Sequence, residues 1–569
     1  MSDGLPLQER PYSPPQNFHE SAAKIMTLGR GARYGALAII LLVALAWRLH
    51  NIGFGLPSLY DPDEPIFMIK ALELLTNGTL NPKWFGHPGS TTIYLLALID
   101  AAVVGSGLAS GAYASVEEFA KAAFADPGLL FIPARAAMAL LGVLAVWMTY
   151  LVGRRTQGTA VALIAAAFLA FNSVHIAWSQ VVRTDIHASV FMLASLLFAI
   201  RIAQHGRIAD YILAGLFAGF AVATKWPAVT IFIAVLGATA SRVIQSRSEL
   251  KRDLFGVIAA GVAVLVGVFV ASPFIFLDWQ TVLANLSNEA RPRHLGHTGA
   301  GFLQNGWWYL WHPVRESVGV MGLLLILAGL LVSAVRSRVS RWTLVPAALA
   351  FFALIASQNL IWSRWVLPLL PMFCVFAAVA IVALGEAIAS ATNSRRPRAI
   401  IAALAALAAI PTVAGAFAQS AERANDTRSQ AARWAVENIP SGSSVAIEHL
   451  ELSLRDQPWT FLFPIGGAGC VDGVRQLTEG VDYEQVEQLR QGSPIVDFGN
   501  VSPDRLESCR ADYAILTYYD LYRAEASAFP KEIQNYEKLL AGGRTVALFE
   551  PRLGRAGGPL VRVVALRRH

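Results

Sequence analysis

Charged residues and cysteines are both scarce in this chain. Only 15% of its 569 residues are Asp, Glu, Lys or Arg, whereas soluble domains carry about 25%. The hydrophobic content of 55% and the mean hydropathy of +0.48 therefore indicate an integral membrane protein. Three cysteines in this length argue against a disulfide framework and against a Cys-rich zinc site.

Glycine-rich phosphate loops are missing as well. The sequence contains no Walker pattern and no convincing nucleotide-sugar site, which argues against a nucleotide-linked substrate. The net charge of +7 does not indicate nucleic-acid binding, because the Lys and Arg residues form short clusters between apolar segments, as the positive-inside rule requires. Residues 1–30 contain no apolar run and are not a cleavable signal, so we expect residues 1–33 to be a cytoplasmic tail.

Apolar runs of about 20 residues, long enough to cross a bilayer as helices, recur along residues 34–420. If all the basic clusters face the cytoplasm, successive apolar runs from residue 129 onward cross the membrane in alternating directions. The loops 51–128 and 278–317 then face outward. We therefore expect an α-helical polytopic membrane protein with about eleven transmembrane helices. The expected spans are 34–50, 129–151, 157–179, 186–204, 210–224, 227–242, 255–277, 318–335, 342–360, 365–390 and 399–418.

Two places in this scheme allow more than one interpretation. The further apolar run 90–108 breaks the alternation, so we expect a juxtamembrane or half-inserted helix; the alternative is that it crosses and that one basic cluster lies outside. At Lys225-Trp226-Pro227 we expect a break between two spans, because proline is unfavourable inside a helix. The alternative there is one kinked helix with a snorkelling lysine.

Residues 421–569 have a different character, with more charge and amphipathic periods. They predict an extracytoplasmic α/β domain, with a helix over 427–440 that has Trp434 and Val436 on its apolar side. Strands are expected at 441–448 and 512–522, a helix at 532–543 and a last strand at 544–551. Cys470 and Cys509 lie in this domain and are either free or paired in an oxidising compartment. Cys374 lies in a span, as an inert core thiol.

The stretch from Tyr60 to Thr92 carries the most concentrated chemistry. It begins with three acids in four positions, continues as a short amphipathic helix and ends on His87-Pro88-Gly89. Ionisable groups at a membrane boundary are costly, so each needs a reason. For a single residue that reason can be snorkelling or helix capping, and for Asp61 we favour a turn before Pro62. His294 and His297 are equally compatible with a loop that has no role. The ionisable residues expected at the outer face are Asp61, Asp63, Glu64, His87, Arg183, Asp185, Lys225, His294, His297 and Arg364.

Most of these residues belong to five short sequence elements, which follow one another over residues 34 to about 420. In their order and spacing these elements resemble the GT-C glycosyltransferases, in particular the protein O-mannosyltransferase and lipid A aminoarabinose transferase relatives. The matching elements are Asp63-Glu64, His87-Pro88-Gly89 (with Gly in place of a second Pro), Arg183-Thr184-Asp185, the Lys225 that follows GLFAGFAVAT, and Arg364-Trp365-Val366-Leu367-Pro368-Leu369-Leu370-Pro371.

The resemblance implies inverting transfer of a sugar from a polyprenyl-phosphate carrier to an acceptor hydroxyl of a glycan, lipid or protein. In that reading Asp63 is the catalytic base, and Glu64 and Asp185 are supporting acids. Cations surround the leaving phosphate as its charge builds; the candidates are Lys225, Arg364, Arg183 and His87. We expect no cofactor and no metal, although a divalent cation is possible. The expected location is the inner (plasma) membrane, with the N-terminus in the cytoplasm.

Three other functions compete with this reading. A transporter or lipid flippase predicts charges near mid-span and internal repeats, whereas the charges here fall at span ends. A polymerase or ligase of lipid-linked glycans also uses polyprenyl carriers, but the Asp63-Glu64 pair argues against that class. A receptor with anchoring spans does not need eleven of them.

Overall fold

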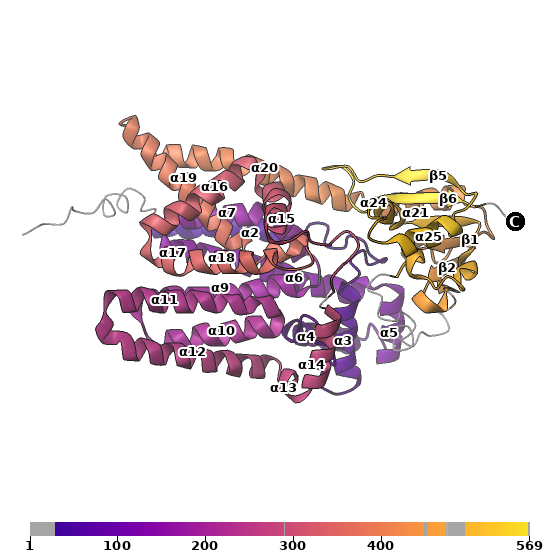
Figure 1. The fold of residues 1–569 in the computed structure, drawn as a ribbon, viewed down its shortest axis with the longest axis horizontal. Helices are drawn as coiled ribbons and strands as arrows, with labels where there is room; N and C mark the ends of the chain where they lie inside the picture. The colour runs from indigo at the N-terminus through magenta and orange to yellow at the C-terminus, as the bar shows by residue number, and fades with distance from the viewer. Residues whose placement is uncertain (1–28, 290, 449–451, 474, 476–495, 567–569) are drawn as a thin grey trace, which may run out of the picture.

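The protein forms a long helical bundle with an α/β domain at one end (Figure 1). The computed structural model describes residues 29–289, 291–448, 452–473, 475 and 496–566; most of the tail expected at 1–33 lies outside them. The helices of the bundle are α2 (Arg30–Leu49), α6 (Gly128–Thr156), α7 (Thr159–Phe171), α8 (Ser173–Ser179), α9 (Thr184–His205), α10 (Ile208–Thr224), α11 (Phe232–Gln245), α12 (Leu250–Ala271), α16 (Arg315–Arg336), α17 (Arg338–Trp342), α18 (Leu344–Ala356), α19 (Leu370–Ala391) and α20 (Pro397–Ala424).

Among the described residues, ten helices are long and apolar enough to cross a membrane, or eleven if α7 and α8, which meet at a 61° bend, are counted as one. About eleven transmembrane helices were expected, and the expectation of a polytopic membrane protein is confirmed. Several expected spans have different ends; the helix expected over 255–277, for example, ends at Ala271. The helix expected from 318 already begins at Phe302 and bends at Gly319, whose φ is 72°. The helix expected from 365 begins only at Leu370.

Short helices occupy the end of the bundle that faces the α/β domain. In Figure 1, α3 and α14 run across the direction of the long helices α9 to α12. The segment 278–317, expected to be a loop, is thus largely helical. The short helices are α3 (Glu64–Thr76), α5 (Val116–Ala125), α13 (Phe274–Leu277), α14 (Trp279–Glu289) and α15 (Phe302–Tyr309). The longer α4 (Ser90–Ala109) packs against α3 and α5.

The chain leaves α2 and enters α6 at the same end of the bundle. Arg135, near the start of α6, donates hydrogen bonds to the carbonyl oxygens of Ile52 and Phe54, at 2.9 and 2.8 Å, just after α2. Within 51–127, all of which the structure describes, α4 is the one helix long and apolar enough to span. A single crossing by α4 would put α6 at the opposite end. These contacts therefore support a non-crossing α4, which packs with α3, α5 and the first turns of α6.

The C-terminal domain has a six-stranded sheet in the order β3-β2-β1-β4-β6-β5. β1 is parallel to β2 and β4, and the other pairs are antiparallel. This confirms the expected α/β domain. Its elements are α21 (Thr427–Asn438), β1 (Ser444–Ile447), β2 (Thr460–Pro464), β3 (Cys470–Asp472), β4 (Tyr513–Leu516), α24 (Tyr519–Ala524), α25 (Pro530–Leu539), β5 (Arg544–Phe549) and β6 (Val561–Ala565).

Three local expectations for this domain are wrong in part. The segment 512–522 is a strand only as far as Leu516 and a helix from Tyr519. The strand expected at 544–551 is present as β5, but it is not the last one, because β6 follows it. The apolar side expected for α21 is half right: Trp434 packs against the domain core, whereas Val436 is 47% exposed. The fully buried part of the helix consists of small residues, including Ala431, Ala432 and Ala435. A helix that packs closely on a sheet needs small side chains at the contact. The periodicity of apolar residues does not distinguish small from large apolar side chains, so it did not identify this face.

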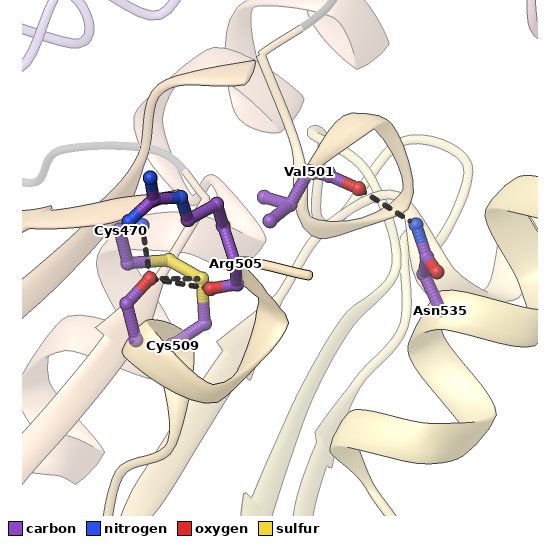
Figure 2. The surroundings of a disulfide bond; sticks show 6 residues. Cys470, Val501, Arg505, Cys509 and Asn535 are labelled. Carbon is purple, nitrogen blue, oxygen red and sulfur yellow. Dashed lines mark hydrogen bonds between the residues drawn. A yellow bond between two sulfur atoms is a disulfide. The ribbon is translucent and has the colours of Figure 1, made fainter. Parts of the chain in front are cut away.

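Cys470 and Cys509 form a disulfide (Figure 2), so the pairing left open by the sequence is settled. The bond joins β3 to the turn that precedes β4. Ser508 reinforces the junction, since its hydroxyl accepts from the Cys470 amide at 2.8 Å and donates to the Arg505 carbonyl at 2.6 Å. Disulfides persist in oxidising compartments, which supports an extracytoplasmic domain. Cys374 is free and buried.

The topology can be tested with reporters fused after residues 112 and 154. A non-crossing α4 places residue 112 on the outer side and residue 154 in the cytoplasm, because α6 is then the first span after α2. Fusions to alkaline phosphatase and to a fluorescent protein distinguish the two sides. A reporter that is cytoplasmic at 112 and external at 154 would contradict the arrangement.

Candidate active site

Arg183 joins two acids of the loop that follows α2, Asp61 and Asp63. Its Nε and Nη2 donate to the carboxylate of Asp61 at 3.1 and 2.8 Å, and its Nη1 pairs with Asp63. Asp61 also accepts a hydrogen bond from the Asp63 amide at 3.0 Å. The turn expected at Asp61 is therefore present, but the residue is an ion-pair partner as well. Asp63 is left at the N-cap of α3 with its side chain one-third exposed.

Glu64 points away from these groups and holds the loop in place. Its carboxylate receives two hydrogen bonds from Arg135, at 2.9 and 2.6 Å, and both side chains are 0% exposed. The same carboxylate accepts from the Val182 amide at 2.8 Å. Glu64 thus ties α3 to α6 and to the residue before Arg183, a positioning contact that fits the supporting role expected for it. Arg135 was missed from the sequence, although an arginine two turns into a span is a signal by itself.

His87 and Lys225 are brought together by backbone pairing. Pro88 and Lys225 form an antiparallel bridge, and the Trp226 amide donates to the His87 carbonyl at 3.2 Å. Gly89 adopts a φ of 74° where the chain turns into α4, a conformation that glycine adopts without strain. Lys225 is extended, between α10 and the 3₁₀ turn Trp226–Ile231. The expected break at this position is confirmed.

A second group of charges completes the site. Lys225 pairs with Asp185 at the start of α9. Arg364, in the 3₁₀ turn Ser363–Val366, lies 3.8 Å from Asp63 and 4.0 Å from Asp185. Three carboxylates and three cations, from four segments far apart in sequence, thus alternate at the end of the bundle near the α/β domain.

The electrostatic environment sets the protonation state of each group. Burial by itself raises the pKa of Asp63, but the charges of Arg183 and Arg364 outweigh it and hold the pKa well below its usual range. Burial, together with the charges of Lys225 and Arg364, lowers the pKa of His87 to about 3. His87 is therefore neutral at pH 7, so it can offer a ring N–H to an anion but no charge. Burial also lowers the pKa of Lys225, which the charge of Asp185 opposes. Burial brings the pKa of Arg364 to about 10, so Arg364 remains cationic at pH 7.

Aromatic rings line the cations. Trp178 in α8 lies 5.4 Å from the Arg183 guanidinium and 6.0 Å from that of Arg364, measured to the ring centroid. Trp362 lies 4.1 Å from the Arg364 guanidinium and stacks on His297. The sequence singled out His297 without a partner and did not single out either tryptophan, because these contacts depend on tertiary packing.

No group of three or more His, Cys, Asp or Glu side chains in the described part of the chain is arranged to hold a metal ion. The candidate acids are instead paired with cations or, for Glu64, turned toward Arg135. Whether a divalent cation takes part stays a prediction.

The Glu64–Arg135 pair predicts a strong dependence of stability on both partners. Arg135→Leu leaves the Glu64 charge buried without its cationic partner, which costs about 3–5 kcal/mol, so thermal unfolding in detergent should shift to markedly lower temperature. Glu64→Gln with Arg135→Leu should recover part of the loss. Arg154→Leu, an exposed arginine at the other end of α6, is the matched control and should unfold like the wild type. Equal unfolding temperatures for Arg135→Leu and Arg154→Leu would contradict this role.

Comparison with known proteins identifies the fold of this chain. Residues 128–276, about a quarter of the chain, match the profile of a family described as dolichyl-phosphate-mannose-protein mannosyltransferase. No curated protein sequence matches. ArnT from Cupriavidus metallidurans bound to undecaprenyl phosphate has a TM-score of 0.50 at 16% identity, over 95% of this chain and 98% of that one. The Archaeoglobus fulgidus oligosaccharyltransferase tethered with an acceptor peptide has a TM-score of 0.48 at 16% identity, over 90% and 72%. The nearly full-length likeness to ArnT confirms the expectation from the sequence: this multi-pass membrane protein has the GT-C fold.

Proposed function

We propose that this chain is an inverting membrane glycosyltransferase that moves a sugar from a polyprenyl-phosphate carrier to an acceptor hydroxyl on the outer face of the membrane. The observation that carries the proposal is the position of Asp63. It is a partly exposed carboxylate in contact with Arg183 and 3.8 Å from Arg364, with Lys225 held nearby by Asp185. A base thus lies beside cations that suit a phosphate.

The chemistry needs one base and several cations. The acceptor oxygen attacks the anomeric carbon while its proton passes to Asp63. The bond between that carbon and the phosphate oxygen breaks, and the oxygen leaves with the electron pair. No acid is required, because a lipid phosphate is a stable anion. Its growing charge is stabilised by Arg364 and Lys225, of which Arg364 offers a planar pair of donors and Lys225 a point charge.

The remaining candidate residues fit secondary roles. Arg183 fixes Asp63 and adds positive charge, and His87 is placed to donate a neutral hydrogen bond to the phosphate. One carboxylate oxygen of Asp185 orients Lys225. The other oxygen of Asp185 has no hydrogen-bond partner among the described residues and is left for a sugar hydroxyl. No resident metal or other cofactor is part of the proposal.

The membrane location fits a lipid carrier. A polyprenyl chain can lie between spans while its phosphate reaches the boundary, and the similar ArnT structure holds undecaprenyl phosphate. We place the protein in the inner (plasma) membrane with the N-terminus in the cytoplasm. The Cys470–Cys509 disulfide supports an extracytoplasmic C-terminal domain, and the acceptor is a glycan, lipid or protein that reaches this side.

Asp63→Asn is the direct test. The variant keeps the shape of the side chain but cannot take the proton, so transfer should fall by roughly 10²–10⁴-fold while undecaprenyl phosphate still binds. Transfer is measured with radiolabelled polyprenyl-phosphate sugars in membranes, and binding by native mass spectrometry. Activity above about a tenth of wild type would rule out Asp63 as the base, since general-base catalysis contributes more than that.

The pH dependence tests the Arg183 contact. The reaction requires ionised Asp63, so activity is lost as pH falls through its pKa. The nearby arginines hold this pKa well below its usual range, and the acid limb of kcat/KM for the wild type should lie correspondingly low. In Arg183→Gln one of the two arginines that oppose the effect of burial is gone, so the limb should move to higher pH. The activity ratio of variant to wild type should therefore rise with pH across the acid limb of the variant; a constant ratio would contradict the assignment.

A further inference from the structure

The Arg364 side chain lacks the hydrogen bonds that hold the other cations of the site. Arg183 and Lys225 both donate hydrogen bonds to carboxylates. Arg364 approaches Asp63 and Asp185 only at 3.8 and 4.0 Å, beyond hydrogen-bond distance. Its buried Nε has no partner among the described residues. Another contact must therefore fix the direction of this guanidinium.

Trp362 provides that contact. Its ring is 4.1 Å from the Arg364 guanidinium, within the range of a cation–π interaction. On Trp362 the ring of His297 stacks with a centroid distance of 3.6 Å and an interplanar angle of 22°. The Trp362 backbone is held too, since its amide donates to the buried Tyr309 hydroxyl at 3.3 Å.

His297 is in turn fixed by a short ladder. The Ile361 amide donates to the His297 carbonyl at 2.9 Å, and the Gly299 amide donates to the Asn359 carbonyl at 2.7 Å. The His297 Nδ1 lies 3.2 Å from the Ile361 carbonyl oxygen. The ring thus has a defined place against Trp362.

The same segment is anchored in the C-terminal domain. Leu295 is 3% exposed and belongs to the domain core, where it packs in one cluster with residues such as Phe498 and Leu516. The amide of the next residue, Gly296, donates a hydrogen bond to the carboxylate of Glu525 in the domain at 3.1 Å. A continuous set of contacts therefore leads from the domain core to Arg364.

We propose that Trp362 is the positioning residue for Arg364, and that the C-terminal domain sets its place by holding Leu295. The domain is then a structural part of the phosphate-binding site rather than an appended module. The inference rests on the proposed function only in the role given to Arg364; the geometric dependence of Arg364 on Trp362 and Leu295 holds without it.

The first experiment needs no substrate. Purified wild type, Trp362→Leu, Trp362→Phe and Leu295→Ala are treated with phenylglyoxal, and modification of Arg364 is followed by peptide mass spectrometry. We expect the Leu and Ala variants to react several-fold faster at Arg364, while Trp362→Phe, which keeps a ring, stays close to wild type. Arg154 serves as the internal reference, and Trp279→Leu, which removes an exposed tryptophan, should leave the Arg364 rate unchanged. Equal Arg364 rates in wild type, Trp362→Leu and Leu295→Ala would overturn the proposal.

Donor kinetics provide the second experiment. If Arg364 binds the donor phosphate, Trp362→Leu should raise the donor KM about tenfold or more, with partial rescue in Trp362→Phe. In the double variant Trp362→Leu with Leu295→Ala, the donor KM should rise little beyond that of the worse single variant, because both substitutions disturb the same set of contacts. Faster modification without any glycosyl transfer in the wild type would reject the proposed function and keep the positioning role. Normal transfer with an unchanged donor KM in Trp362→Leu, together with an unchanged rate of Arg364 modification, would reject the positioning role alone. The same kinetics with faster modification would instead reject the role of Arg364 in binding the donor phosphate.

Discussion

The bidentate contact of Arg183 with Asp61, together with its pairing to Asp63, is the constraint on which the site depends. It joins the loop after α2 to the loop before α9, 122 positions apart in sequence. Without the guanidinium, two carboxylates two residues apart would repel each other at a boundary of low polarity. With it, Asp63 has a fixed place from which it can face a substrate. The N-cap position of Asp63 on α3 and the buried pair of Glu64 with Arg135 fix the same loop from its other side.

The sequence predicted the site better than it predicted the contacts that support it. Three of the five motif elements stand at the end of a span, and the other two lie in the loop between α2 and α6, at the starts of α3 and α4. Span ends and loops on one side of a membrane meet at one boundary. Asp63, Arg183, Lys225 and Arg364 therefore come together as the topology implies. Their individual roles stay predictions.

Supporting contacts were not accessible from the sequence. Which ring stacks on Arg364 depends on a ladder between residues near 298 and 360, and nothing in the local pattern marks either segment as a partner of the other. Asp61 likewise reads as a turn residue before proline, and its second role appears only when Arg183 arrives from elsewhere in the chain. The helix at 302–309, where a loop was expected, and the exposed Val436 show the same limit for elements. Apolar patterns indicate that a helix or strand is present, but packing decides where it begins and which face it buries.

If Asp63 is the base, as proposed, the balance of charges in the site bears on how a carboxylate with so low a pKa could accept a proton. With Asp61, Asp63 and Asp185 opposite Arg183, Arg364 and Lys225, the site is nearly neutral before any anion enters. A donor phosphate would then compete with the carboxylates for the cations that are held least firmly. Arg364 is such a cation, because it makes no hydrogen bond to either acid. When it turns its charge toward the phosphate, Asp63 loses one of the two arginines that depress its pKa, and its affinity for a proton rises. Binding of the donor would therefore itself strengthen the base, and the weak contact at 3.8 Å becomes the feature that links the two halves of the reaction.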